Sequence, residues 1–197
     1  MNLEKPWAKP YQSLLVDLDR TWPAVNPTRR LSYQKVDPFM ALYTYRVFEG
    51  DFGGERLEVD ISEFPDPGYT FLEGADNVEY LRLQLRQKLP YDIKIRREVM
   101  IDRIRKAIGL DWEFQTGNQE FDKEFFIAAR TDRGKRLLVD PTFQSSVKGL
   151  SPFTVLGISP TGLFWSRHIS DKSQLTISAI EPVLGRLHQM LQYVSGP

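Results

Sequence analysis

The stretch Gln119–Leu150, QEFDKEFFIAARTDRGKRLLVDPTFQSSVKGL, has the clearest local pattern in the chain and decides the fold class that we expect. Its run Phe125–Ala128 has few polar interruptions, and the apolar side chains there alternate in direction along an extended backbone. Such a strand is normally covered on both faces, so we expect it at the centre of a sheet. This central strand is expected to contain Phe121, Phe125 and Ile127, with Phe126 and Ala128 facing the other way.

Two short helices are expected after this strand. Asp132 can cap a first helix that ends near Val139, and Asp140 can cap a second, because an aspartate accepts hydrogen bonds from the free N–H groups of a helix start. Pro141 then occupies the first helical position, where its missing N–H costs nothing. The buried face of the second helix is expected to carry Phe143, Val147 and Leu150.

Alternation of apolar and polar residues predicts strands elsewhere in the chain. Ala41–Val47 and Leu57–Ile61 alternate on either side of the turn-rich sequence EGDFGGE, which predicts a hairpin with one polar face. Glu79–Leu89 has the composition of a helix, but its leucines fall at every second position, so we expect a strand. Further strands are expected at Asp92–Arg96, at Leu110–Gln115, and in a final hairpin of Thr154–Ser159 and Leu163–His168.

A helical period appears in two other segments. Apolar residues share one stripe over Arg97–Ile108, and Gly109 follows as a C-cap. The closing helix is expected to have Pro182 in its first turn. Its buried stripe is Ile180, Leu184, Leu187, Leu191 and Val194. The chain is therefore expected to form an α+β domain over residues 39–197, in which a mainly antiparallel sheet of about seven or eight strands is covered by about three helical regions.

Residues 1–38 are expected to form an N-terminal arm, because their five prolines interrupt regular structure. The apolar run Tyr11–Leu18 is long enough for a short helix, and Trp7 and Trp22 flank it. The arm either packs on its own domain or docks into a partner through aromatic anchors. In the second case the partner-binding residues are Trp7, Tyr11 and Trp22.

The composition excludes several kinds of chemistry. The chain has no cysteine, so disulfides, thiolate metal sites and a cysteine nucleophile are excluded. It has 26 basic and 26 acidic residues, so no net field favours nucleic acid, and any charged contact would be local. No segment approaches the roughly 18 apolar residues of a membrane span, and the N-terminus lacks a signal-peptide core. We therefore expect a cytoplasmic protein that binds no nucleic acid.

No catalytic residue, metal site or cofactor is expected. His168 and His188 are too few for a histidine metal site, and no glycine-rich phosphate loop occurs. The basic residues between Lys94 and Lys106 are interleaved with acidic ones and lack the stacking aromatics of a nucleic-acid surface.

One carboxylate face leaves an alternative open. Glu58, Asp60 and Glu63 share a side of the predicted hairpin and could bind a hard cation. Arg46 and Arg56 are close enough to pair with them across the hairpin, so a solvated polar face is expected. The alternative is a small enzyme or ligand-binding protein, with or without a metal, whose cleft uses Glu58, Asp60 and Asp92 with Arg46 or Lys94.

The segment from Leu89 onward, LPYDIKIRRE and then GLDWEFQTGNQEFDKEFFIAARTDRGKRLLVDPTF, resembles a family of bacterial domains of unknown function that often follow transmembrane helices. The resemblance covers about residues 89–168 and lies in apolar and turn positions, so it implies a shared fold and no activity. The proline-rich arm stands where the family has its membrane helices, which leaves peripheral membrane association open.

The expected function is that of a non-catalytic interaction module. A soluble accessory or scaffold protein would bind a protein partner through its N-terminal arm and one face of its domain. The missing catalytic motifs and the tryptophans of the arm are the observations behind this hypothesis. The sequence leaves the oligomeric state open.

Overall fold

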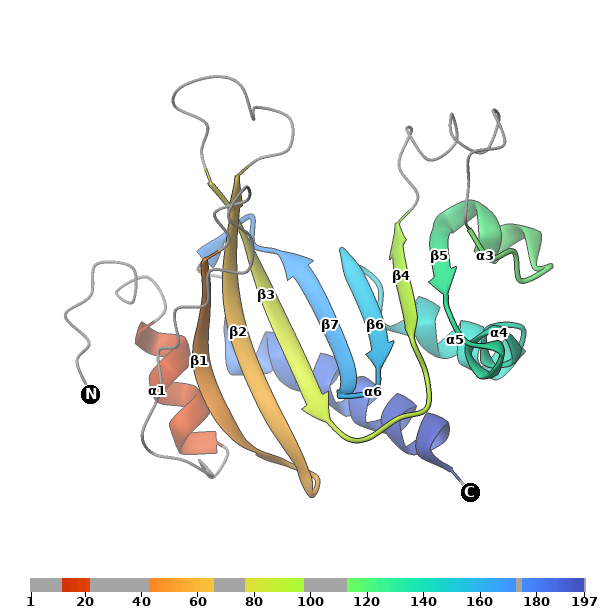
Figure 1. The fold of residues 1–197 in the computed structure, drawn as a ribbon. Coiled ribbons are helices and arrows are strands. Elements are labelled where there is room, and N and C mark those ends of the chain that lie inside the picture. The colour runs from red at the N-terminus through yellow and green to blue at the C-terminus, as the bar shows by residue number, and fades with distance from the viewer. Residues whose placement is uncertain (1–11, 22–42, 66–76, 98–112, 173–174, 197) are drawn as a thin grey trace. The chain divides into compact units, whose positions relative to one another are not determined.

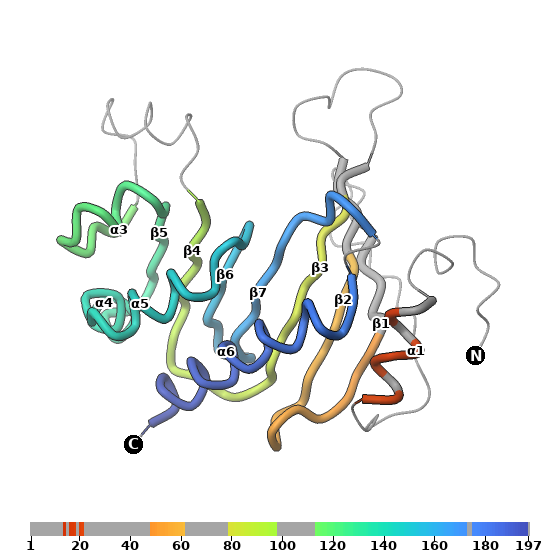
Figure 2. Tube along the Cα trace, turned by 180° about the vertical axis from the view of Figure 1, so that it is seen from behind, coloured from red at the N-terminus to blue at the C-terminus, as the bar shows by residue number. Residues whose placement is uncertain are grey.

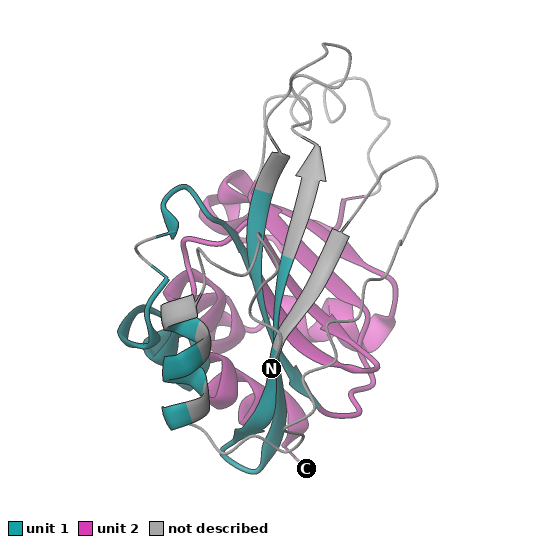
Figure 3. Cartoon of the chain, turned by 90° about the vertical axis from the view of Figure 1, so that its left-hand side faces the viewer, with its two compact units in different colours: residues 1–86, 166–185 teal, residues 87–165, 186–197 magenta. Residues whose placement is uncertain are grey.

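The computed structural model describes residues 12–21, 43–65, 77–97, 113–172 and 175–196. Its seven-stranded sheet has the order β1-β2-β3-β7-β6-β4-β5, and helices accompany it (Figure 1). The expected α+β class is confirmed. The chain divides into two compact units, unit 1 with residues 1–86 and 166–185 and unit 2 with residues 87–165 and 186–197 (Figure 3).

Unit 1 is built on the predicted hairpin. Strand β1 (Tyr43–Phe52) pairs antiparallel with β2 (Glu55–Pro65), and β2 pairs antiparallel with β3 (Asn77–Arg86). The turn between β1 and β2 holds Gly53 and Gly54 at φ angles of 64° and 87°, a region that glycine adopts without strain and that a tight hairpin turn requires.

The apolar core of unit 1 comes from alternate residues of neighbouring strands. The leucines of β3 lie opposite the aliphatic residues of β2, so both sets share one face of the sheet. Helix α1 (Gln12–Thr21), which the run in the arm predicted, contacts β1 and buries Leu14 and Leu18. Each such side chain contributes about 1.5–3 kcal/mol when fully buried. The strand residues of this core are Phe48, Leu57, Val59, Ile61, Leu81, Leu83 and Leu85.

Unit 2 is built around β4 (Ile93–Arg97), which pairs antiparallel with β5 (Phe125–Ala129) on one side and with β6 (Val155–Ser159) on the other. Strand β7 (Gly162–His168) follows β6 as the second arm of the predicted hairpin, and the boundary between the units falls inside it. The two predicted hairpins and the strands expected at Glu79–Leu89 and Asp92–Arg96 are thus confirmed over the described residues, with β3 ending at Arg86.

The position predicted for β5 is wrong, because β5 ends the strand order and is not central. Phe121 lies in helix α3 (Gln119–Glu124), which Asn118 caps, and does not extend the strand. Helices α3, α4 and α5 lie beside β5 (Figure 1, Figure 2), and the N–H of Phe114 donates to the carbonyl of Ile127 at 2.8 Å. Flanking helices and a loop therefore cover this edge strand, as proteins commonly protect such edges.

The two helices after β5 follow the prediction closely. Helix α4 (Asp132–Leu138) is capped by Thr131, whose hydroxyl accepts from Gly134 N at 3.1 Å, so the cap lies one residue before the predicted Asp132. Helix α5 (Pro141–Gly149) is capped by Asp140, as predicted. Its expected buried face is confirmed for Phe143, Val147 and Leu150.

Helix α6 (Ile177–Ser195) is longer than predicted. It begins before the expected start, so Pro182 lies inside the helix and not in its first turn. The predicted stripe of Ile180, Leu184, Leu187, Leu191 and Val194 is buried throughout. Among the described residues, no helix combines the length and the apolar character that crossing a membrane demands.

Two predictions fall wholly or partly outside the described residues. The helix expected over 97–108 and its C-cap Gly109 lie there almost entirely. Of the strand expected at Leu110–Gln115, the structure describes only residues 113–115, which form no strand. The division of the chain near residue 38 stays a prediction.

Candidate functional site

A row of charged side chains runs across β1, β2 and β3 in unit 1. We call it the charged face, and its residues alternate with those of the apolar core. The strand register sets Glu49 and Gln84 on either side of Glu58, and Arg82 beside Asp60. The charged face consists of Glu49, Arg56, Glu58, Asp60, Arg82, Gln84 and Arg86.

The expectation of a solvated polar face is wrong for the middle of this row. Glu58 is 2% exposed, Asp60 4% and Gln84 2%, so both faces of β2 are buried at this point. Alternation along a strand indicates which way a side chain points, but it does not indicate whether that side is covered. Buried carboxylates are uncommon in proteins, which makes this row the first place to look for function.

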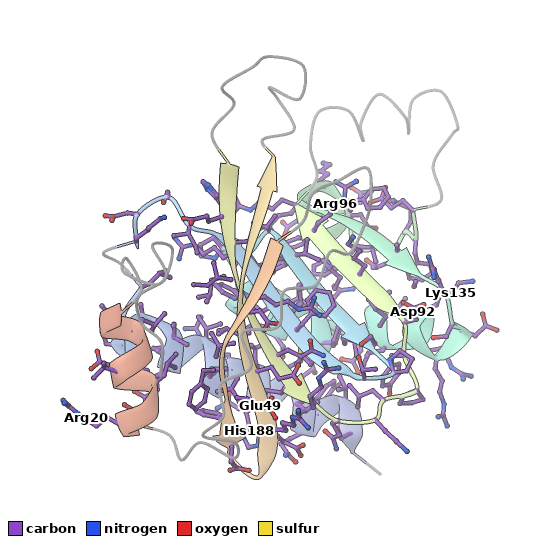
Figure 4. The ribbon with its side chains drawn as sticks, turned by 60° about the vertical axis from the view of Figure 1, so that its left-hand side comes forward. Arg20, Glu49, Asp92, Arg96, Lys135 and His188 are labelled. Carbon is purple, nitrogen blue, oxygen red and sulfur yellow. The ribbon has the colours of Figure 1, made fainter. Side chains whose placement is uncertain are left out.

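Arginines compensate the charge of Glu58. Arg86 Nε donates to Glu58 Oε2 at 2.7 Å, and Arg86 Nη2 lies 2.7 Å from the same oxygen. Arg56 Nε lies 3.6 Å from Glu58 Oε1. Arg56 also pairs with Glu49, which Figure 4 labels on β1. Glu49, Arg56, Glu58 and Arg86 therefore form a ladder of ion pairs across the strands.

The remaining residues of the alternative cleft are divided between the units. The side chains of Arg46 and Glu63 lie outside the described part of the structure. Asp92 and Lys94 belong to unit 2, where Arg130 Nη1 lies 3.6 Å from Asp92 Oδ2 and Lys94 is exposed. Within the residues that the structure describes, no group of three or more His, Asp or Glu could hold a metal ion.

The two histidines occupy ordinary surface positions. His168 stacks at a tilt against Tyr80, with ring centroids 5.7 Å apart. His188 Nε2 lies 3.2 Å from Gln192 Nε2, one turn further along α6. Each histidine side chain therefore contacts a side chain of its own unit, as a structural residue does.

A second feature lies on the surface of unit 2, where α4, α5 and α6 approach one another. Val139 is 48% exposed and Tyr193 is 41% exposed, and these are two of the three large exposed apolar side chains among the described residues. Asp140, the neighbour of Val139, accepts a hydrogen bond from the Tyr193 hydroxyl at 2.7 Å. One carboxylate therefore holds an exposed tyrosine of α6 beside the end of α4.

Asp140 has further donors. It accepts from Thr142 N at 2.7 Å and from Phe143 N at 3.4 Å, which caps α5. The bond from Tyr193, followed by that from Thr142, lowers the pKa of Asp140 below its ordinary value. The same contact raises the pKa of Tyr193, because its hydroxyl donates to a carboxylate. Both pKa shifts arise mainly from the same hydrogen bond, which favours a neutral tyrosine bound to a charged aspartate.

Exposed basic residues lie on α4, the helix that ends just before Asp140. Arg133, Lys135 and Arg136 are exposed, and Lys135 projects outward from α4 (Figure 4). We call the set of Arg133, Lys135, Arg136, Val139 and Tyr193 the α4–α6 surface. Sequence reasoning missed it, since 53 residues separate Asp140 from Tyr193 and nothing local signals their contact.

The partner-binding residues predicted in the arm lie outside the described residues, which begin at Gln12 within this part of the chain. The helix between them is described: α1 turns Leu14 and Leu18 inward, and Val16 is 43% exposed. Part of the arm therefore packs on β1 of its own unit. The positions of Trp7, Tyr11 and Trp22 stay untested.

No protein-family model and no curated protein sequence matches the chain.

Proposed function

We propose that the chain is a non-catalytic interaction module, a soluble accessory or scaffold protein of the cytoplasm that binds a protein partner through its N-terminal arm and the α4–α6 surface. The observation that carries the proposal is Tyr193, a large aromatic side chain that is exposed and yet fixed by the carboxylate of Asp140. The exposed Val139 next to Asp140 adds apolar area at the same place.

A fixed surface tyrosine is well suited to binding. Tyrosine is enriched among the residues that dominate the energy of protein interfaces, because its ring offers apolar area and its hydroxyl offers a polar end. A side chain that moves freely in the unbound protein costs about 0.5–1.5 kcal/mol of conformational entropy when binding immobilises it. The bond from Tyr193 to Asp140 removes part of that cost before the partner arrives.

The arm supplies the second contact in this proposal. Its tryptophans flank α1, whose buried leucines attach it to unit 1 and whose Val16 faces outward. Aromatic anchors next to a docked helix can bind a partner without ordering a long free tail. Trp7, Tyr11 and Trp22 are the residues that we propose for this contact.

The test uses the full-length chain as bait in its native source, followed by reconstitution with each recovered protein and calorimetric measurement of Kd. Removal of residues 1–38 is a poor variant, because it also removes Leu14 and Leu18 from the core. The informative variants are Trp7→Ala with Trp22→Ala, and Tyr193→Ala. The matched control is Tyr80→Ala, which truncates an aromatic side chain of β3 that belongs to neither proposed contact.

A purified binary complex that weakens at least about tenfold in both informative variants supports the proposal, since truncated interface anchors typically cost more than about 1 kcal/mol each. The control should bind as the wild type does. A complex that forms equally well with all variants contradicts the proposal, and so does the failure of every recovered protein to bind the pure chain.

The burial of Glu58 and Asp60 favours one second candidate, a small enzyme or ligand-binding protein that uses the charged face. Asp60→Asn tests it, in a screen of cationic small molecules by thermal shift. A ligand that raises the Tm of the wild type and not of this variant supports the second candidate. The arginines around Glu58 explain its burial without a ligand, so we rank this candidate below the first.

A further inference from the structure

We infer that the α4–α6 surface binds an acidic segment of a protein partner that carries at least one large apolar side chain. The inference rests on the proposed function and specifies the chemistry of the partner. It depends on how α4 is fixed, on which cations of the surface lack a counter-charge, and on the apolar side chains between them.

Packing fixes which side of α4 faces outward. Gly134 and Leu138 are buried one turn apart, and a Cβ at Gly134 would lie only 3.0 Å from Ile93 Cγ1, so the helix backbone lies close against β4. Arg133, Arg136 and Val139 follow one another at intervals of three residues on the opposite, exposed side. Residues three apart are neighbours on a helix surface, so these side chains form one stripe.

The cations of this stripe lack counter-charges within the part of the chain that the structure describes. Arg133 and Arg136 have neither an ion pair nor a side-chain hydrogen bond to any described residue. Lys135 Nζ lies 3.6 Å from Asp132 Oδ1, but Asp132 is 91% exposed, and such a pair contributes little. Asp140 already accepts three hydrogen bonds, so its charge is engaged.

These charges match an acidic segment. Each free guanidinium can bind a carboxylate through two parallel hydrogen bonds, which is the strongest common pairing of these groups. The chain as a whole has balanced charge, so the attraction is local to this surface and specifies where an acidic partner docks.

An acidic polypeptide fits the surface better than nucleic acid does. Nucleic-acid grooves need a track of cations along the backbone and aromatics that stack on bases. Here Asp132 precedes the three cations, and the exposed Val139 lies between the arginines and Asp140 along the chain. An apolar side chain of the partner would cover Val139 and the ring of Tyr193, while its flanking carboxylates would reach Arg133 and Arg136.

The experiment measures the binding of synthetic peptides to the full-length protein by fluorescence anisotropy. The main probe is a glutamate-rich peptide with one central phenylalanine. One control peptide has glutamine in place of glutamate, and another has serine in place of phenylalanine. A duplex oligonucleotide is the nucleic-acid probe. The variants are Arg133→Glu with Arg136→Glu, and Tyr193→Phe.

The matched control variant is Lys88→Glu with Lys123→Glu. It changes the net charge by the same amount at two exposed residues of unit 2 that lie outside the α4–α6 surface. Urea unfolding establishes that all variants remain folded, as surface substitutions usually do.

We expect the main probe to bind more tightly than either control peptide and to weaken with salt. The double arginine variant should weaken binding about tenfold or more, as two lost ion pairs predict, and the control variant should not. Tyr193→Phe should weaken binding a few-fold, since the ring stays and loses its anchor.

Equal weakening in the two double variants would overturn the inference, because net charge alone would then explain binding. Equal binding of the glutamine peptide, tighter binding of the oligonucleotide, or no binding of the main probe would also overturn it. A partner complex that depends on Trp7 and Trp22, with no binding of the main probe, would overturn this inference and leave the proposed function standing. If neither a partner complex nor binding of the main probe is found, both this inference and the proposed function are overturned.

Discussion

Arg86→Met tests whether the charged face is a compensated, buried ladder. The substitution keeps an unbranched apolar side chain and removes the guanidinium whose Nε donates to Glu58 Oε2 and whose Nη2 lies 2.7 Å from the same oxygen. Glu58 is 2% exposed, and the contact from Arg56 that remains is longer, with Arg56 Nε 3.6 Å from Glu58 Oε1 and beyond hydrogen-bond distance. The variant therefore removes the two shortest arginine contacts of a buried carboxylate.

The burial of the two partners sets the magnitude. Removing one partner of a buried ion pair costs about 3–5 kcal/mol, because the other charge stays buried without compensation. The lower end of this range applies here, because Arg86 is 36% exposed and solvent still reaches the ion pair. We therefore expect a loss of about 3 kcal/mol. Glu58→Gln should cost only about 1 kcal/mol, because the arginine that it leaves behind can turn toward water.

The assay is urea unfolding followed by circular dichroism. With a slope of about 2 kcal/mol per molar urea, the expected loss lowers the midpoint by about 1.5 M. Arg130→Met is the matched control, because its pair with Asp92 is long and its side chain is 84% exposed, so it should cost about 0–1 kcal/mol. Equal losses for Arg86→Met and Arg130→Met would refute the reasoning, since burial would then make no difference.

Three further predictions concern unit 2. Gly157→Ala should lower the free energy of unfolding by about 1–3 kcal/mol, because the new Cβ would overlap the ring of Phe164, and Gly157→Ala with Phe164→Leu should recover most of the loss in a thermal melt. Trp165→Phe should cost about 1–2 kcal/mol in urea, because Trp165 Nε1 donates to the buried carbonyl of Leu150 at 3.1 Å; a smaller loss than Arg130→Met gives would contradict this. The Asp140–Tyr193 bond should make stability depend on pH at both ends of the range. The lowered pKa of Asp140 gives a contribution that is complete above the ordinary value of 3.8 and is lost as pH falls through the folded pKa. The raised pKa of Tyr193 gives one that is complete below 10.0 and is lost as pH rises through the folded pKa. The Tm difference between wild type and Tyr193→Phe should therefore shrink at low and at high pH, and a difference that is constant with pH would contradict the bond.

The sequence predicted local structure well wherever one physical signal acted alone. Alternation located β1, β2 and β3, because a side-chain period of two fits only a strand. Asp140 and Pro141 marked the start of α5 correctly, since a cap and a first-turn proline act within a few residues.

Prediction failed where two local signals competed. Phe121, Phe125 and Ile127 fit a strand, but Phe121 and Phe125 are also one helical turn apart, and their rings lie 5.0 Å apart in the structure. The cap at Asn118 and the acidic residues in the first turn stabilise a helix over Gln119–Glu124. That cap was readable from the sequence and outweighed the apolar alternation.

Long-range features could not be predicted. The place of β5 at the end of the sheet depends on which strands pair, and burial of Glu58 depends on what covers one face of β2. The contact of Asp140 with Tyr193 joins residues that share no local pattern. The sequence therefore predicted the fold class and named Glu58 and Asp60 as candidates, whereas their burial and the α4–α6 surface came from the structure.

Asp140 joins three helices through one carboxylate: it follows α4, caps α5 and binds the tyrosine of α6. Arg186 adds a second link, because its guanidinium donates to the carbonyl of Gly149 at the end of α5. Segments that share such links tend to open and close as one cooperative unit. In native-state hydrogen exchange, the amides of α4, α5 and the second half of α6 would therefore share one opening free energy, so a partner on the α4–α6 surface would also slow exchange in α5, which contributes no residue to that surface.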